Sequence, residues 1–108
     1  NLHRNRHKMI DMDLLKELKN YLDITWDNED TDSKLTGILG RAESTLNAYA
    51  GYEIPFSEQP DSKQLLFDCC RYIYNNAFED FKINFQQELI MLRANQAVKD
   101  IEKEVSDI

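Results

Sequence analysis

Histidine is missing from most of this sequence. The only histidines, His3 and His7, lie in the first eight residues, so a Ser-His-Asp or Cys-His set has no histidine elsewhere. Their spacing suits two metal ligands on a helix, but no third His and no Cys lies nearby in the sequence. There is no phosphate-binding glycine-rich loop, no metal-type Cys/His spacing and no internal repeat. We therefore expect no enzymatic activity, no catalytic residue, no metal and no cofactor.

Long apolar runs are also missing. No uninterrupted stretch approaches the ~18 apolar residues that a membrane span needs, and there is no signal-peptide pattern. The two cysteines, Cys69 and Cys70, are adjacent. Neighbouring helical side chains point about 100° apart, so the pair is poorly placed to form a disulfide or share a metal. We expect a soluble intracellular protein with no membrane contact, in which the cysteines are half-buried small apolar residues.

Positive charge is scarce outside the N-terminal segment. The net charge is −7, although Arg4, Arg6 and Lys8 bring three positive charges and no acid to the first eight residues. The rest of the chain is therefore more acidic than the total suggests. Such a body lacks the clustered Lys and Arg of a sequence-independent nucleic-acid binder. It suits a surface past which DNA slides without sticking, or one that docks on a basic partner.

The core is predicted to centre on residues 65–92, which contain no Pro and no Gly. Apolar residues recur there at gaps of three and four, which places each of two series on one helix face. Asn75 and Asn76 are weak helix formers and separate the series, so we expect one long bent helix or two helices end to end. The second series includes Phe81, Phe85 and Leu89, which are all expected to be mostly buried.

Three further signals mark the other helices. Asp11 or Asp13 caps a first helix that ends near Asp23, and a second helix covers residues 31–50, with Gly51 as its C-terminal cap. The segment with both prolines is a loop, after which Asp61 and Gln64 resemble a capping box that opens the central helix. The predicted fold class is all-α: a small helical bundle with two longer antiparallel helices, a shorter N-terminal helix laid across them and a C-terminal helical extension.

An acidic segment precedes the second helix. Its carboxylates include Asp27, Glu29, Asp30 and Asp32. A calcium loop starting at Asp27 would require Gly where Asp32 stands and Glu where Ile38 stands, so the calcium motif fails. We expect a solvated loop that binds no metal and whose last acids cap the next helix. Trp26, the lone aromatic residue here, is expected to fold back onto the core.

The chain divides into three parts. Residues 1–8 are expected to be a disordered tail, and not part of the native sequence, since Met9 and Met12 are candidate starts. Residues 9–93 form the helical domain, and residues 94–108 form an extension whose apolar stripe, which includes Val98, Ile101 and Val105, needs a partner to bury it. Gly37 and Gly40 interrupt the second helix, where glycine allows close helix packing or contact with another subunit.

The order of three segments carries a family resemblance. LLKELKNYLDITWDNEDTDSKL is followed by ILGRAESTLNAYAG and then by LLFDCCRYIYNNAFEDFKINFQQELIMLR. Together these segments resemble the head–tail connector family of long-tailed bacteriophages and prophages, whose members are also described as adaptor, completion or DNA-packaging proteins. The resemblance covers residues 14–93 and depends on order and overall texture, since no segment is a catalytic signature.

The resemblance implies a homo-oligomeric ring at the virion neck, assembled in the host cytoplasm and twelve-fold on the portal. The implied partners are the portal protein above, a stopper or tail-completion protein below, and DNA that passes without sequence-specific binding. On this hypothesis the extension and the helix side with Gly37 and Gly40 form head-to-tail contacts. The carboxylates of the acidic segment then lie toward the channel or its rim. The competing class is a small acidic regulatory binder that mimics DNA, but its acids would coat one continuous face.

Overall fold

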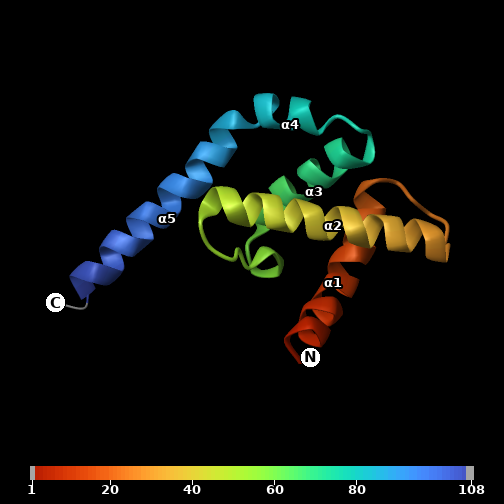
Figure 1. Cartoon of the computed structure of the whole chain (residues 1–108), viewed down its shortest axis with the longest axis horizontal. Coiled ribbons are helices and arrows are strands. Elements are labelled where there is room, and N and C mark those ends of the chain that lie inside the picture. Colours follow the sequence, from red (N-terminus) through yellow and green to blue (C-terminus); the bar gives the residue numbers. More distant parts are fainter. Residues whose placement is uncertain (1, 107–108) are drawn as a thin grey trace.

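Every regular element of the described backbone is helical. The computed structural model describes the backbone of residues 2–106 and the side chains of residues 12–95 and 98–106. Within that range the chain forms five α-helices, one short 3₁₀ turn and no strand, which confirms the all-α prediction (Figure 1). In chain order the elements are α1 (Leu2–Tyr21), α2 (Glu29–Ala50), η1 (Phe56–Glu58), α3 (Pro60–Tyr74), α4 (Phe78–Asn84) and α5 (Gln86–Ser106).

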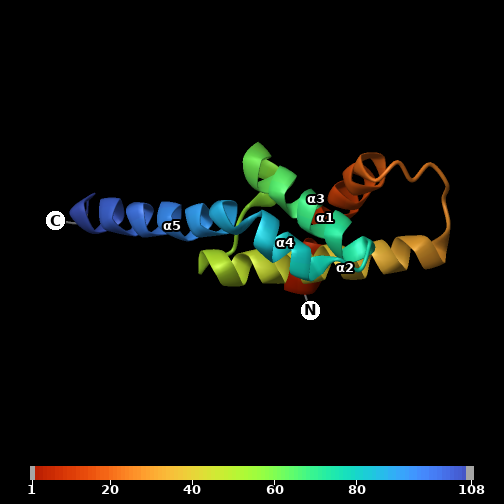
Figure 2. The same ribbon diagram turned by 90° about the horizontal axis from the view of Figure 1, so that it is seen from above.

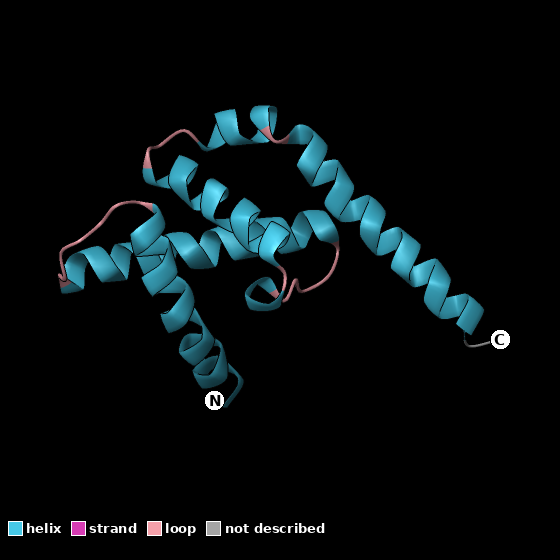
Figure 3. Ribbon diagram, turned by 180° about the vertical axis from the view of Figure 1, so that it is seen from behind, coloured by secondary structure: helices cyan, strands magenta, loops and turns pink. Residues whose placement is uncertain are grey.

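The central layer consists of α2 and α3. α3 runs back across α2 in the opposite general direction, and α1 lies across the pair (Figures 1 and 3). Fully buried side chains from these helices and from α4 form the core: Leu18, Leu35, Leu39, Leu46, Leu66, Cys69, Cys70 and Phe81. α5 leaves this body as an arm that continues beyond the end of α2 (Figure 2). The arm makes the molecule long and flat, with extents of 53 × 36 × 21 Å.

α1 and α3 end in the same local motif. Asp23 after α1 and Asn76 after α3 adopt left-handed backbone conformations, with φ of 60° and 57°. At each end the next residue's N–H bonds back over five residues, Ile24 to Lys19 and Ala77 to Tyr72. This is the Schellman pattern, which satisfies the last carbonyls of a helix. The predicted end near Asp23 and the predicted break at Asn75–Asn76 are both confirmed.

α2 is capped at both ends. The predicted C-terminal cap is confirmed, since Gly51 has a φ of 84° and donates its N–H to the carbonyl of Asn47. The start differs from the prediction because Asn28, and not an acid, is the N-cap. Its side chain accepts bonds from the N–H groups of Asp30 and Thr31, and α2 therefore begins two residues early, at Glu29.

Two other helix starts also differ from the predictions. α1 begins at Leu2, so residues 2–8, predicted to be disordered, are helical and α1 is not the shorter helix of the bundle. No Gly or Pro interrupts residues 1–21, and Leu, Arg, Lys and Met are good helix formers. α3 begins at Pro60, whose fixed φ suits the first helical turn, and no side chain caps it. The predicted capping box at Asp61 is therefore wrong.

The second half of the central stretch bends once more, at Phe85. One helical hydrogen bond reaches Phe85 from each side of the bend, from Phe85 N to Phe81 O and from Leu89 N to Phe85 O. The Phe85 ring stacks on Phe81 at 4.9 Å and meets Tyr72 of α3 edge-on at 5.7 Å. Phe81 and Leu89 are buried as predicted, but Phe85 is only half-buried. Its ring lies at the outer side of this aromatic cluster.

Candidate interaction surfaces

The four carboxylates of the acidic segment lie together at the start of α2. Glu29, Asp30 and Asp32 occupy its first turn, where negative charge favours the positive end of the helix dipole. Lys19 of α1 forms ion pairs with Asp32 at 2.9 Å and with Asp27 at 3.0 Å. These two bonds raise the pKa of Lys19, the bond to Asp32 contributing more. Two of the four carboxylates therefore tie the acidic segment to α1, and all of them except the partly buried Asp32 are exposed to solvent.

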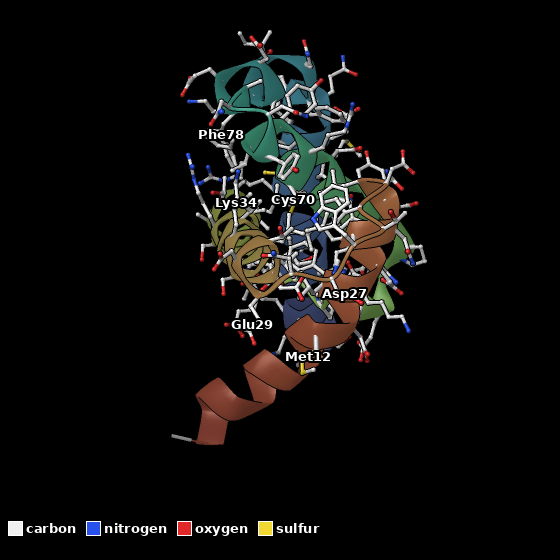
Figure 4. All side chains as sticks on the ribbon, turned by 90° about the vertical axis from the view of Figure 1, so that its right-hand side faces the viewer. Met12, Asp27, Glu29, Lys34, Cys70 and Phe78 are labelled. Atoms are coloured by element: carbon white, nitrogen blue, oxygen red, sulfur yellow. The ribbon has the colours of Figure 1, made fainter. Side chains whose placement is uncertain are left out.

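The segment contains no metal cluster in the structure. Among the side chains that the structure describes, no group of three His, Cys, Asp or Glu residues is arranged to hold an ion. The side chains of His3 and His7 lie outside this set. Asp27 and Glu29 are exposed residues beside the start of α2, away from the buried Cys70 (Figure 4). The Asp27 side chain pairs with Lys19 and is still 99% exposed, so a partner can reach it from solvent.

Removing the cap of α2 should weaken the fold measurably. We expect Asn28→Ala to lower the free energy of unfolding by about 1 kcal/mol, because two N–H groups lose their acceptor. Urea unfolding monitored by circular dichroism measures the change. Asn28→Asp, which keeps an acceptor oxygen, is the control and should lie near the parent protein. An Asn28→Ala variant as stable as the parent would show that the cap contributes nothing.

Trp26 does not fold back onto the core, contrary to the prediction. Its side chain is 52% exposed, and its indole N–H points to the Thr31 hydroxyl at 3.4 Å. Ile24 fills the core position beside the end of α1 instead, with 5% exposed. The acidic segment thus carries an exposed aromatic side chain, a residue type enriched in protein interfaces. The only signal in the sequence was that Trp26 is a lone aromatic residue in a polar segment.

Gly37 and Gly40 lie on the solvent side of α2. A Cβ atom built at either position would meet no atom within 4 Å. Close packing within the described part of the chain therefore does not require glycine, although each glycine costs about 1 kcal/mol relative to alanine. Of the two alternatives for these positions, contact with another subunit is the one that stays open.

The arm carries an exposed apolar stripe. Val98, Ile101 and Val105 are 53%, 60% and 65% exposed. Helical spacing continues their face back through Ala94 to Ile90 and Met91, which are also more than half exposed. The three predicted contact residues of the extension therefore share one face, which we call the arm stripe (Val98, Ile101 and Val105). Ile108, also expected on this face, lies outside the described residues.

A groove lies where α5 leaves the body, and sequence reasoning missed it. Its volume is about 700 Å³. Tyr49 of α2, Ile83 of α4 and Ile90 of α5 expose apolar surface there, and Ile83 is 72% exposed. Lys82 and Arg93 are the basic residues of its lining. We call it the α4–α5 groove; its residues are Tyr49, Lys82, Ile83, Gln86, Leu89, Ile90, Arg93 and Ala94.

The two cysteines are more buried than predicted. Both are free thiols with no exposed surface, and Cys70 lies in the interior (Figure 4). Burial raises the pKa of Cys69 to about 12 and raises that of Cys70 further. Glu43, a buried carboxylate of α2, adds to the rise at Cys70. Both groups stay protonated at neutral pH, and a neutral thiol is a poor nucleophile or metal ligand.

The thiols should react only when the protein unfolds. With a pKa near 12, the thiolate fraction of Cys69 at pH 8 is about a thousandfold below that of an ordinary thiol. The raised pKa of Cys69 also makes the free energy of unfolding depend on pH. Its contribution to stability is fully present below about pH 9 and is lost as the pH rises toward 12. We expect a chromogenic disulfide to label both thiols in urea and neither in buffer at pH 8. Rapid labelling in buffer would contradict the described burial.

Comparison with known proteins adds no relative. A scan against protein-family models and searches of curated proteins and of solved structures all found no match. Among the described residues, no helix combines the length and the apolarity needed to cross a membrane.

Proposed function

We propose that this chain is a structural virion protein, a head–tail connector that forms a ring beneath the portal, retains packaged DNA and attaches the tail. The observation that carries the proposal is the arm stripe. Three apolar side chains at helical spacing, each more than half exposed, are typical of a helix that meets a partner. The resemblance of residues 14–93 to connector proteins implies the class of partner: further copies of the chain, the portal, and a stopper or tail-completion protein.

Two features of the molecule support a structural role. The arm projects from a closed core, so a partner can cover it without disturbing the packing of α1–α4 (Figure 2). The exposed side of α2 with Gly37 and Gly40 leaves room for the close approach of a neighbouring helix. Weak contacts of this kind gain strength when the portal holds many copies side by side. The proposed site of action is the virion neck, reached after assembly in the host cytoplasm.

The charge of the acidic segment supports the proposed passage of DNA through the ring. Asp27, Glu29 and Asp30 are exposed at one end of α2, within a chain whose net charge is −7. At the rim or wall of a ring, these carboxylates repel phosphate groups and keep DNA from adhering. The competing regulatory role as a DNA mimic receives less support. Lys19 pairs with Asp27 and Asp32, and its single positive charge offsets one of the four acids, while the other acids of the chain are mixed with Lys and Arg along the sequence.

Electron microscopy of the purified protein, alone and mixed with the portal of the encoding phage or prophage, tests the proposal. We expect twelve-fold rings seated on the portal, and filled heads that lose DNA when the protein is omitted. Free protein that stays monomeric is compatible with assembly on the portal only. A protein that never binds the portal under any ionic condition would refute the connector function.

A further inference from the structure

The arm stripe and the α4–α5 groove are complementary in shape and apolar character. The stripe is a convex row of Val98, Ile101 and Val105 on one helix face. The groove is a concave site of about 700 Å³ whose exposed surface includes Ile83 and Ile90. This volume lies within the ~300–1,000 Å³ typical of binding pockets. The arm stripe is convex and the α4–α5 groove is concave, and each exposes aliphatic side chains.

Their charges are also complementary. Glu102 and Glu104 are exposed on the arm, on either side of the stripe. Lys82 and Arg93 line the groove. Lys82 also pairs with Glu79 at 2.8 Å, so the exposed Arg93 is the main positive group available to a docked acid. An acidic ridge entering a basic-edged cleft gives favourable pairs, whereas two stripes facing each other bring acids together.

One molecule cannot join its own two surfaces. Ile90 of the groove and Ile101 of the stripe lie on the same helix, eleven residues apart. At 1.5 Å per residue they are about 16 Å apart along the axis, and an unbroken helix cannot fold back on itself. The complementary ridge and cleft therefore meet only between two copies.

We propose that the arm stripe of one copy docks in the α4–α5 groove of the next copy. The contact rests on the proposed function, since it supplies the subunit interface of the ring. It differs from the earlier hypothesis because it assigns the groove, and not the glycine side of α2, as the acceptor of the arm. The interface is head-to-tail. Each copy uses its arm stripe to bind one neighbour and its α4–α5 groove to receive the arm stripe of another.

Disulfide trapping tests the contact, because it also captures weak encounters. Protein carrying Ile83→Cys is mixed under oxidation with protein carrying Val98→Cys, Ile101→Cys or Val105→Cys. We expect at least one mixed pair to form a dimer about tenfold faster than the control pair Ile83→Cys with Ser106→Cys, because docking raises the local thiol concentration. Ser106 is an exposed arm residue outside the stripe. The native thiols are buried, and circular dichroism checks that every variant is folded.

Two outcomes would overturn the inference. One is a rate for every mixed pair that equals the Ser106 control. The other is faster dimerisation of an arm variant alone, which would show that two arms pair with each other. Portal rings formed by the parent protein without mixed-pair trapping would refute the docking and leave the connector function standing. Mixed-pair trapping without portal binding would establish the docking and refute the connector function.

Discussion

Phe81→Ala should lower the free energy of unfolding by about 3–5 kcal/mol, which is the range for removing a fully buried aromatic side chain. Phe81 has no exposed surface. Its ring stacks on Phe85 and meets Tyr72 of α3 edge-on at 5.7 Å. The substitution leaves a cavity at the junction of α3 and α4 and removes the contacts that hold α4 in place. Urea denaturation followed by circular dichroism measures the loss.

Two matched variants sharpen this measurement. Ile83→Ala lies two residues away on α4 with its side chain 72% exposed, so its effect should stay within about 0.5 kcal/mol. Phe85→Ala should fall between the two, because the Phe85 ring is only half-buried. Equal losses for Phe81→Ala and Ile83→Ala would contradict the described packing of α4.

Deleting residues 94–108 should abolish ring formation on the portal and leave the domain folded. The deletion removes the arm stripe, whose side chains are mostly exposed and contribute little to the core. The core helices and the buried Leu89 remain, so the melting temperature should change by only a few degrees. Electron microscopy of portal mixtures, together with DNA retention by filled heads, measures the functional loss.

A point variant shows whether the assembly defect comes from the missing length of the arm or from the missing apolar side chains of the arm stripe. Ile101→Asp keeps the full arm and places a charge in the middle of the stripe, so it should reproduce the assembly defect. Ser106→Asp adds the same charge away from the stripe and should assemble normally. Normal rings and normal DNA retention by the truncated protein would remove the arm from the assembly mechanism.

Local signals in the sequence were sufficient for the helix ends that depend on one or two residues. Gly51, which has no Cβ, and Asn76, whose short polar side chain tolerates a positive φ, adopt left-handed conformations, so the breaks there were predictable. The bend at Phe85 was not, because the apolar spacing continues through it and the bend coincides with ring contacts to another helix. The burial of both cysteines was also missed. A single buried stripe exposes one of two neighbours, but α3 is covered over a wide arc that includes Leu65, Leu66 and Phe67.

Of the two candidate contact surfaces, the arm stripe was predictable from the sequence and the α4–α5 groove was not. The arm stripe lies on one helix, so the spacing of Val98, Ile101 and Val105 was enough to predict a shared face. The α4–α5 groove joins Tyr49 to residues more than thirty positions later, and such a contact has no signature in local spacing. Ile83 and Ile90 did give a partial signal. They are seven residues apart and fall outside the series that fills the core.

The aromatic bend at Phe85 has a geometric consequence for an assembly built through the arm. Phe85 is bonded on both sides, its N–H to Phe81 O and its carbonyl to Leu89 N–H, and its ring packs against Phe81 and Tyr72, so these contacts hold the angle of the bend. That angle sets the direction in which α5 points from the body, and with it the rotation between successive copies. The curvature of the assembly, and therefore the number of copies that closes a circle, depends on the packing of Tyr72, Phe81 and Phe85. Substitutions inside this cluster should change the diameter of the central opening.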